Sequence, residues 1–275
     1  MLGTFACIGV HSRTYLLTMW SLRDWRRRRT LARHPIPDHL WQAACARLPV
    51  LAPLSAAEHA RLRQHATLLL ATKTISGAGG LEPDDAMRVR IAALAALPLL
   101  GLDLDWYDNW HEIVVYPDTF VQEHEWEDEF GVMHRERREL DGESWQQGPV
   151  VLAWHEVEAS GQGSGFNLVV HEIAHKLDMQ NGDANGHPPL QRGMSNKEWG
   201  DTFSAAYEDM VRRDETGEAT PLDPYAADAP EEFFAVACEA FFETPAQLRA
   251  AYPAVYEQLS LFFRRDPLAR PSAAG

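Results

Sequence analysis

Residues 168–178 read Leu-Val-Val-His-Glu-Ile-Ala-His-Lys-Leu-Asp, and this stretch decides how the rest of the chain must be arranged. His171 and His175 are one turn apart on an α-helix, so both imidazoles can reach one metal ion. Glu172 lies beside them and can point at water held by that ion. The pattern is HExxH, which is typical of zinc peptidases, because neutral imidazole nitrogens suit zinc.

The residues around this motif indicate a buried helix. Leu168, Val169, Ile173 and Leu177 recur at helical spacing and would face a core, while the polar side chains enter a cleft. The alternative is an ordinary helix with two solvated histidines. The neighbouring motifs described below favour the metal helix over that alternative.

Composition and charge limit the class of protein. The chain has 275 residues, of which 45% are hydrophobic, and a formal net charge of −15. This length is enough for a substantial globular core. The acidic balance argues against a protein that coats nucleic acid, although a basic partner stays open. We therefore expect no direct nucleic-acid partner.

Cysteine usage and hydropathy predict the compartment. Cys7, Cys45 and Cys238 are widely separated and odd in number, so neither a disulfide framework nor a cysteine metal site is indicated. No uninterrupted apolar run reaches 18 residues, so no membrane span is expected. These features together predict a cytoplasmic protein.

The two ends of the chain are predicted to be tails around one domain. Arginines at 26–29 follow the apolar N-terminal residues instead of preceding them, which disfavours a signal peptide. Translation could also begin at Met19, and the basic tail could touch anionic lipid, although disorder is the favoured reading. We expect a tail over 1–34, a single domain over 35–267 and a second tail over 268–275.

Local patterns predict a mainly helical chain with few strands. Ser55 and Glu58 form a capping box at the start of one helix. Residues 149–154 are the clearest strand, and its exposed edge could pair with an extended peptide. The acidic run 123–129 is interpreted as a solvated loop in preference to a cation or basic-substrate site, and 161–165 as a flexible connector. Helices are predicted at 38–48, 56–72, 84–97, 196–213, 231–242 and 246–263 with a break at Pro253, a further strand at 112–116, a turn at 77–80 and a hairpin arm at 135–143.

Two histidines do not complete a catalytic zinc site, so a third ligand must lie elsewhere. The metzincin pattern HExxHxxGxxH fails, because Asp178 stands at its glycine and Asn181 at its last histidine. Asp178 shares the helical face of the histidines, but a short carboxylate one turn further along would close a tetrahedron poorly. We expect Asp178 to support the site and not to bind the metal.

The best source of the third ligand is the segment 225–242. Glu231 and Glu232 stand at the head of a plainly buried helix, where a carboxylate needs a partner, although ordinary helix-start chemistry would also place acids there. Glu239, two turns on, could hold a ligand histidine or pack against another polar group.

With these motif residues the chain resembles the Mlc titration factor A family over roughly residues 36–267. That family is similar in its catalytic core to the anthrax lethal factor metallopeptidase domain, in which a Tyr-x6-Glu-Phe-Phe segment supplies the third ligand. The resemblance implies that Glu232, and not Glu231, is the third ligand and that Tyr225 presents its hydroxyl to the site. The segments that carry the resemblance are 36–38, 115–117, 148–154, 169–179, 181–186 and 230–236.

The resemblance also implies one Zn²⁺ ion, aminopeptidase-type activity on small peptides and a regulatory role through binding the glucose repressor Mlc. His171, His175 and Glu232 would hold the ion, Glu172 would act as general base, and Tyr225 would hydrogen-bond the oxyanion. The expected fold is α+β, a zincin-like metallopeptidase core with a small mixed sheet beside the HExxH helix and a mainly helical remainder. Two alternatives are a non-catalytic protein that sequesters a transcription regulator and, less favoured, a metal-free helical scaffold.

Overall fold

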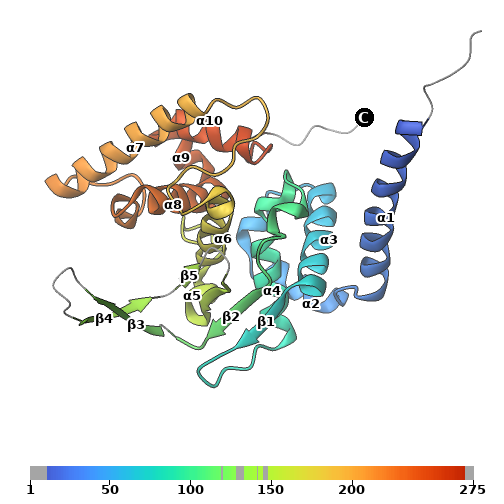
Figure 1. The fold of residues 1–275 in the computed structure, drawn as a ribbon. Coiled ribbons are helices and arrows are strands. Elements are labelled where there is room, and N and C mark those ends of the chain that lie inside the picture. Colours follow the sequence, from blue (N-terminus) through green and yellow to red (C-terminus); the bar gives the residue numbers. More distant parts are fainter. Residues whose placement is uncertain (1–10, 119, 128–132, 141, 145–147, 270–275) are drawn as a thin grey trace, which may run out of the picture.

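The computed structural model describes residues 11–118, 120–127, 133–140, 142–144 and 148–269. It is an α+β structure in which a small mixed sheet lies along one side of the helices (Figure 1). One continuous core cluster joins buried side chains from Ile36 to Phe263. No helix within the described ranges is long and apolar enough to cross a membrane.

The main sheet has four strands in the order β1-β2-β6-β5. The first three are parallel, and β5 runs antiparallel to β6. The bounds are β1 Thr74–Gly77, β2 Glu112–Tyr116, β5 Gly142–Ser144 and β6 Val150–Ala153. Ile113 and Val115 of β2 are buried and alternate with half-buried residues, as expected when one face of a sheet packs on a core.

The position of β6 corrects one prediction. The sequence predicts an exposed edge at this strand that could accept a peptide, but β6 is hydrogen-bonded to β2 on one side and β5 on the other. Residues 150–152 of β6 are therefore paired on both edges. The apolar run that makes β6 the clearest strand in the sequence is itself the sign of a central strand, because both faces and both edges of such a strand are covered.

A second correction concerns the acidic run. The loop predicted for 123–129 is wrong for its described part, because β3 Phe120–Glu127 pairs antiparallel with β4 Met133–Leu140 as a two-stranded hairpin. The hairpin arm predicted at 135–143 is confirmed for the residues of β4. The register sets Glu123 opposite Arg137 and Glu125 opposite Arg135. Asp128 and Glu129 lie outside the described residues.

Within the described residues, the N-terminal half of the chain supplies four helices. Their bounds are α1 His11–Arg33, α2 Asp38–Ala46, α3 Ala56–Thr72 and α4 Asp85–Ala95. The capping box predicted at the start of α3 is present, with the Glu58 amide donating to Ser55 Oγ and the Ser55 amide donating to Glu58 Oε2 at 2.8 Å. The sequence predicts a tail over 1–34, whereas the structure has helix α1 over most of that range. Helix α1 packs on α3, and Arg23 and Arg27 each form an ion pair with Asp105 at 2.7 Å. Residues 1–10 lie outside the described ranges.

The C-terminal half is also helical. Its helices are α5 Trp154–Ala159, α6 Leu168–Asp178, α7 Asn196–Thr216, α8 Pro230–Glu243, α9 Pro245–Ala251 and α10 Pro253–Phe262. The predicted break at Pro253 is confirmed, because α9 ends just before this residue and α10 begins at it. Helix α5, which directly follows β6, was not predicted. Short 3₁₀ turns complete the chain at η1 Pro49–Leu51, η2 Pro98–Leu100, η3 Leu104–Tyr107, η4 Met179–Asn181 and η5 Pro224–Ala227.

Aromatic packing holds the C-terminal helices together. Trp199 of α7 is fully buried and stacks on Phe203 with ring centroids 4.2 Å apart, and the rings of Phe234 and Phe262 surround it. After α10 the chain stays on the body of the protein, where Leu268 packs against the core. The remainder of the tail predicted over 268–275 falls, from residue 270 onward, outside the described residues.

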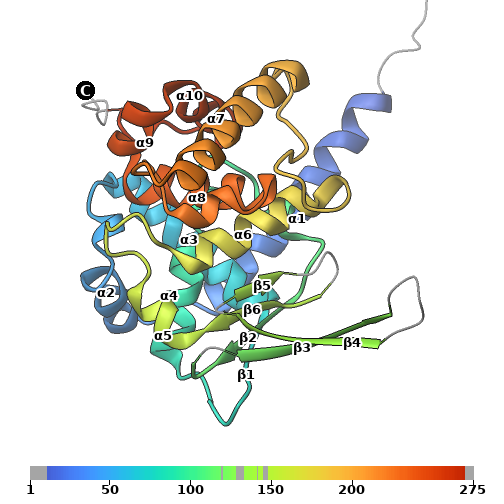
Figure 2. The ribbon, with the colours of Figure 1, turned by 90° about the vertical axis from the view of Figure 1, so that its left-hand side faces the viewer.

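The metal helix predicted from the sequence lies between the main sheet and α8. Helix α6 contacts β5 and β6 on one side and α8 on the other, as Figure 2 shows. All eleven residues of α6 are buried. The helix therefore carries its polar side chains into the seam between the sheet and α8, which explains why an apolar helix contains two histidines and a glutamate.

Candidate metal centre

Helix α6 is fixed at its first turn by its capping residue. The side chain of Asn167, which is fully buried, accepts a hydrogen bond from the Val170 amide at 3.1 Å. The Leu168 amide donates to Ser160 Oγ at 3.0 Å. Two of the amides that a helix start leaves without intrahelical partners are thereby satisfied, which sets the start and rotation of the helix.

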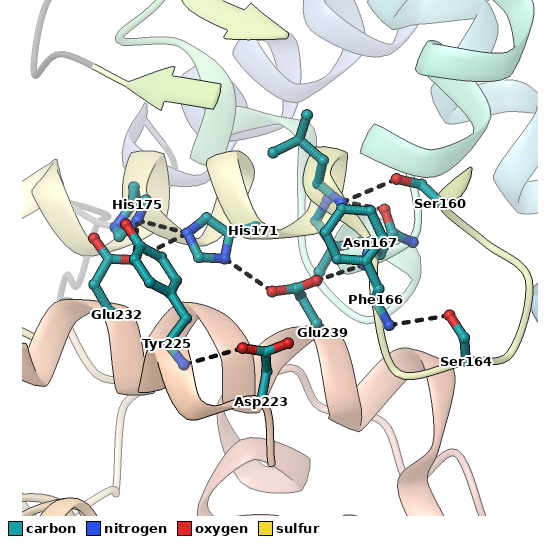
Figure 3. A network of polar contacts seen from close by, with 12 residues as sticks. Ser160, Ser164, Phe166, Asn167, His171, His175, Asp223, Tyr225, Glu232 and Glu239 are labelled. Atoms are coloured by element: carbon teal, nitrogen blue, oxygen red, sulfur yellow. Dashed lines mark hydrogen bonds and ion pairs between the residues drawn. The ribbon is translucent and has the colours of Figure 1, made fainter. Parts of the chain in front are cut away.

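Three predicted residues meet at one point between α6 and α8. The Nε2 atoms of His171 and His175 are 3.1 Å apart, and Glu232 Oε2 lies 3.0 Å from the first and 3.4 Å from the second (Figure 3). Glu231, the other candidate, is not part of this group of possible metal ligands. The start of α8 therefore brings one specific carboxylate to the two imidazoles.

The three donor atoms fit a tetrahedral ion. Bonds of about 2.0–2.2 Å to zinc in a tetrahedron separate neighbouring ligand atoms by about 3.3 Å, which matches the spacing of these three. Two imidazole nitrogens and one carboxylate oxygen are also the donor set of catalytic zinc sites that keep a fourth position open. The chain thus holds a candidate His-His-Glu metal site.

Electrostatics within the cluster favour an ionised carboxylate. Burial alone would raise the pKa of Glu232, but its hydrogen bonds with His171 and His175 hold that pKa well below its usual range. Burial alone would lower the pKa of His171, and its hydrogen bonds with Glu232 and Glu239 raise it instead. A site that concentrates negative charge next to two imidazoles is suited to a cation.

Glu239 sets the orientation of His171. Its Oε1 lies 2.9 Å from His171 Nδ1, and its Oε2 accepts the Asn167 amide. With Nδ1 donating to the carboxylate, Nε2 of the same ring is left as the atom that faces the cluster. Of the two roles predicted for Glu239, holding a ligand histidine is the one that this contact matches.

Asp178 lies outside the cluster and holds a loop. Its Oδ2 accepts hydrogen bonds from the amides of Asn185 and Gly186, both at 2.7 Å. Gly186 in turn accepts a hydrogen bond from Trp199 Nε1 at 3.0 Å, and a Cβ at Gly186 would stand 2.6 Å from the carbonyl oxygen of Pro230. Asp178 thus ties the end of α6 to the start of α8, the helix that carries Glu232.

Glu172 and Tyr225 face a cavity beside the cluster. Glu172 is only 3% exposed, whereas Tyr225 is 46% exposed, and both line a cavity of about 580 Å³. The Tyr225 ring lies 5.9 Å from the His171 ring (Figure 3). Burial, together with the charges of Glu232 and Glu172, raises the pKa of Tyr225, so its phenol stays protonated and can donate a hydrogen bond.

Sequence reasoning missed Lys176 and Glu243. Lys176 is fully buried, and its Nζ donates to the Gly148 carbonyl at 2.9 Å, which ties α6 to the chain entering β6. Burial lowers the pKa of Lys176 to about 8, and the charge of Glu172 opposes that shift. Glu243 accepts from the Gly163 amide at 2.6 Å and from Asn167 Nδ2 at 2.8 Å. The only sequence signal for Lys176 is its place four residues after Glu172, and Glu243 has none.

Comparison with known proteins gives consistent matches. The family model described as glucose-regulated metallo-peptidase M90 matches residues 22–264. Mlc titration factor A of Klebsiella pneumoniae is 43% identical over 232 residues, covering 84% of this chain and 87% of that protein. The proteins of the same name from Cronobacter sakazakii (40% over 248 residues, 90% and 92% covered) and Salmonella arizonae (42% over 238 residues, 85% and 93% covered) are also similar.

Proposed function

This chain belongs to the glucose-regulated metallo-peptidase M90 family, and we propose that it is a zinc-dependent peptidase with a zincin-like core. The observation that carries the proposal is the meeting of His171, His175 and Glu232 beside Glu172, at the wall of a cavity. A structural zinc would prefer four protein ligands, whereas three ligands next to an acidic side chain suit chemistry on a water molecule.

In this proposal, His171, His175 and Glu232 hold one Zn²⁺ ion. Zinc so held would supply positive charge that lowers the pKa of water from about 15.7 toward about 7 and polarises a carbonyl oxygen. Glu239 keeps His171 in the tautomer that the site needs, and Asp178 keeps the start of α8, with Glu232, against α6. Both supporting carboxylates act by positioning.

Glu172 is the proposed general base. Its carboxylate takes the proton from water as the water attacks the scissile carbonyl, and it then delivers that proton to the leaving amine. Its position suits this role, because the side chain is buried beside the candidate metal site and lines the cavity. Tyr225 donates a hydrogen bond to the oxygen that becomes negative, a contribution of about 2.7–4 kcal/mol for donors of this kind.

We propose aminopeptidase-type action on short peptides, in the cytoplasm. The test measures hydrolysis of aminoacyl and dipeptidyl amides by the purified protein, together with its zinc content. Glu172→Gln should keep zinc at one ion per chain and lose turnover by at least about a thousandfold. Turnover that survives in Glu172→Gln would overturn the assigned base, and protein that binds no zinc would overturn the metal site.

The name of the relatives favours a second activity, the binding of a transcription regulator of the Mlc type. Such binding can coexist with hydrolysis, and the two separate with the same variant. We expect Glu172→Gln to bind purified repressor as tightly as the parent does, as measured by calorimetry. A repressor that binds neither protein would exclude this partner and leave the peptidase proposal unaffected.

A further inference from the structure

The cavity beside Glu172 extends well beyond the candidate metal site. It begins at His171 and Glu172 and continues along α6 toward the N-terminus of that helix, where Phe166 and Leu168 line it. Its volume of about 580 Å³ lies within the range of ligand pockets. A catalytic water needs only a small part of that space, so the remainder is available to a side chain of the substrate.

One wall of the cavity is a loop that α8 holds in place. The sequence analysis predicts a flexible connector over 161–165, which is most of this loop. In the structure the buried carboxylate of Glu243 accepts hydrogen bonds from Gly163 and Asn167, while Glu239 accepts the Asn167 amide. Gly161 has φ +82°, a backbone conformation that favours glycine, and a Cβ there would stand 2.6 Å from the Leu48 side chain. This wall is built into the fold.

The opposite wall comes from the segment before α8. Asp223 caps η5 by accepting the Tyr225 amide at 3.0 Å, and the neighbouring Leu222 and Ala226 are buried. Figure 3 shows Asp223 and Tyr225 on the side of the site opposite Phe166. The cavity therefore lies between two anchored segments and is pre-formed.

The side chains that line the cavity are partly apolar, and the charged ones among them are mainly acidic. Leu168, Leu222, Val236 and Ala240 supply apolar surface. The ionisable lining residues besides His171 and Tyr225 are the carboxylic acids Glu172, Asp223 and Glu239, and no lysine or arginine of the described chain lines the cavity. Glu239 is engaged by His171 and Asn167, whereas Asp223 is an exposed carboxylate at the rim.

We propose that this cavity is a specificity pocket for a peptide residue next to the cleaved bond, and that it selects a side chain with an apolar stem and a cationic tip. The inference rests on the proposed peptidase function. The apolar walls bury the stem, and the carboxylate of Asp223 attracts the cation and repels an acidic side chain. Lysine and arginine are the residues of this kind.

The test uses the zinc-loaded protein and peptide amides of the forms X-Ala-Ala and Ala-X-Ala, with X as alanine, methionine, lysine or glutamate. Methionine reports on the stem alone, and lysine adds the charge. Two variants alter the charge without filling the cavity. Asp223→Asn keeps an oxygen to accept the Tyr225 amide, and Gln247→Lys adds a cation at an exposed lining position on α9.

In one of the two series, kcat/KM should increase from alanine to methionine and should favour lysine over glutamate by at least about tenfold. Asp223→Asn should reduce that ratio by about three- to tenfold, and Gln247→Lys should reduce it further, while methionine peptides change little in both. Equal ratios in the parent and both variants would overturn the pocket, even with turnover intact.

Binding separates this inference from the proposed function. Calorimetry on zinc-loaded Glu172→Gln, with and without Asp223→Asn or Gln247→Lys, measures the affinity of the same peptides without turnover. The pocket is supported if the protein binds lysine peptides more tightly and both charge changes weaken that preference. This holds even if the parent hydrolyses no peptide, in which case only the peptidase proposal fails. If the peptides bind without such a preference, the proposed specificity of the pocket is refuted.

Discussion

Gly186→Ala tests whether the loop held by Asp178 positions the third candidate ligand. Gly186 has φ +75°, and an alanine Cβ there would stand 2.6 Å from the carbonyl oxygen of Pro230, at the first turn of α8. That separation is about 0.8 Å short of the 3.4 Å at which ordinary contact begins. Either the loop or the start of α8 must move, and Glu232 lies two residues after Pro230.

The expected size of the effect has two parts. The left-handed backbone alone costs alanine about 1–2 kcal/mol of folding free energy. Relief of the contact with Pro230 requires a displacement of several tenths of an ångström, and the share taken by α8 moves Glu232 against a metal–ligand tolerance of roughly 0.2 Å. Metal affinity should therefore fall by about ten- to a hundredfold, as when residues that support metal ligands are changed.

Gly217→Ala is the matched control. Gly217 has φ +67°, and a Cβ there would meet nothing within 4 Å. It should lose the same 1–2 kcal/mol, measured by urea unfolding of metal-free protein, and keep the metal affinity of the parent. Zinc affinity is measured by competition with a chromophoric chelator. Equal zinc affinity in the parent, Gly186→Ala and Gly217→Ala would refute the argument that this loop positions Glu232.

Three further predictions address other parts of the structure. Ser55→Ala removes the cap of α3 and should lower the free energy of unfolding by about 0.5–2 kcal/mol, measured in urea, whereas Ser55→Asp should keep most of it. Glu239→Gln should weaken zinc binding about ten- to a hundredfold, because the carboxylate next to His171 Nδ1 is lost; unchanged affinity in the chelator assay would show that this contact does not orient the ring. Lys73 donates to the carbonyls of Tyr107 and Trp110, and burial lowers its pKa to about 8 from 10.5. The unfolded chain therefore binds more protons between these values, so this residue makes stability increase as pH rises from 8 toward 10. Lys73→Met should show a smaller increase than the parent over that pH range, and identical pH profiles would contradict the assigned shift.

The parts of this protein that depend on near neighbours were readable in the sequence. The spacing of His171 and His175, the capping box at Ser55 and the break at Pro253 each involve residues within one or two turns, where helix geometry leaves few alternatives. The resemblance to the Mlc titration factor A family, drawn from short motif segments, is confirmed by the matches to that family. The small mixed sheet and the mainly helical remainder were also predicted and are present.

Other features depend on pairing between distant segments. The central place of β6 was mispredicted because β5, the short strand that pairs with its second edge, was not predicted as part of this sheet. The acidic run was read as a loop, although its partner strand carries the opposite charges. In both cases the missing information was the identity of the neighbouring strand.

The sequence by itself determined that a buried helix carries two histidines and a glutamate on one face, because a period of 3.6 residues follows from the backbone alone. Residue patterns alone left Glu231 and Glu232 open, and the family resemblance favoured Glu232. Only the tertiary structure gives the physical reason, because the rotation of α8 turns Glu232 toward His171, 61 residues away in the chain. That rotation results from the packing of α8 on α6 and from the contact of Gly186 with Pro230. The orientation of α8 depends on many weak contacts between residues that are distant in the sequence. A local sequence pattern does not contain this information.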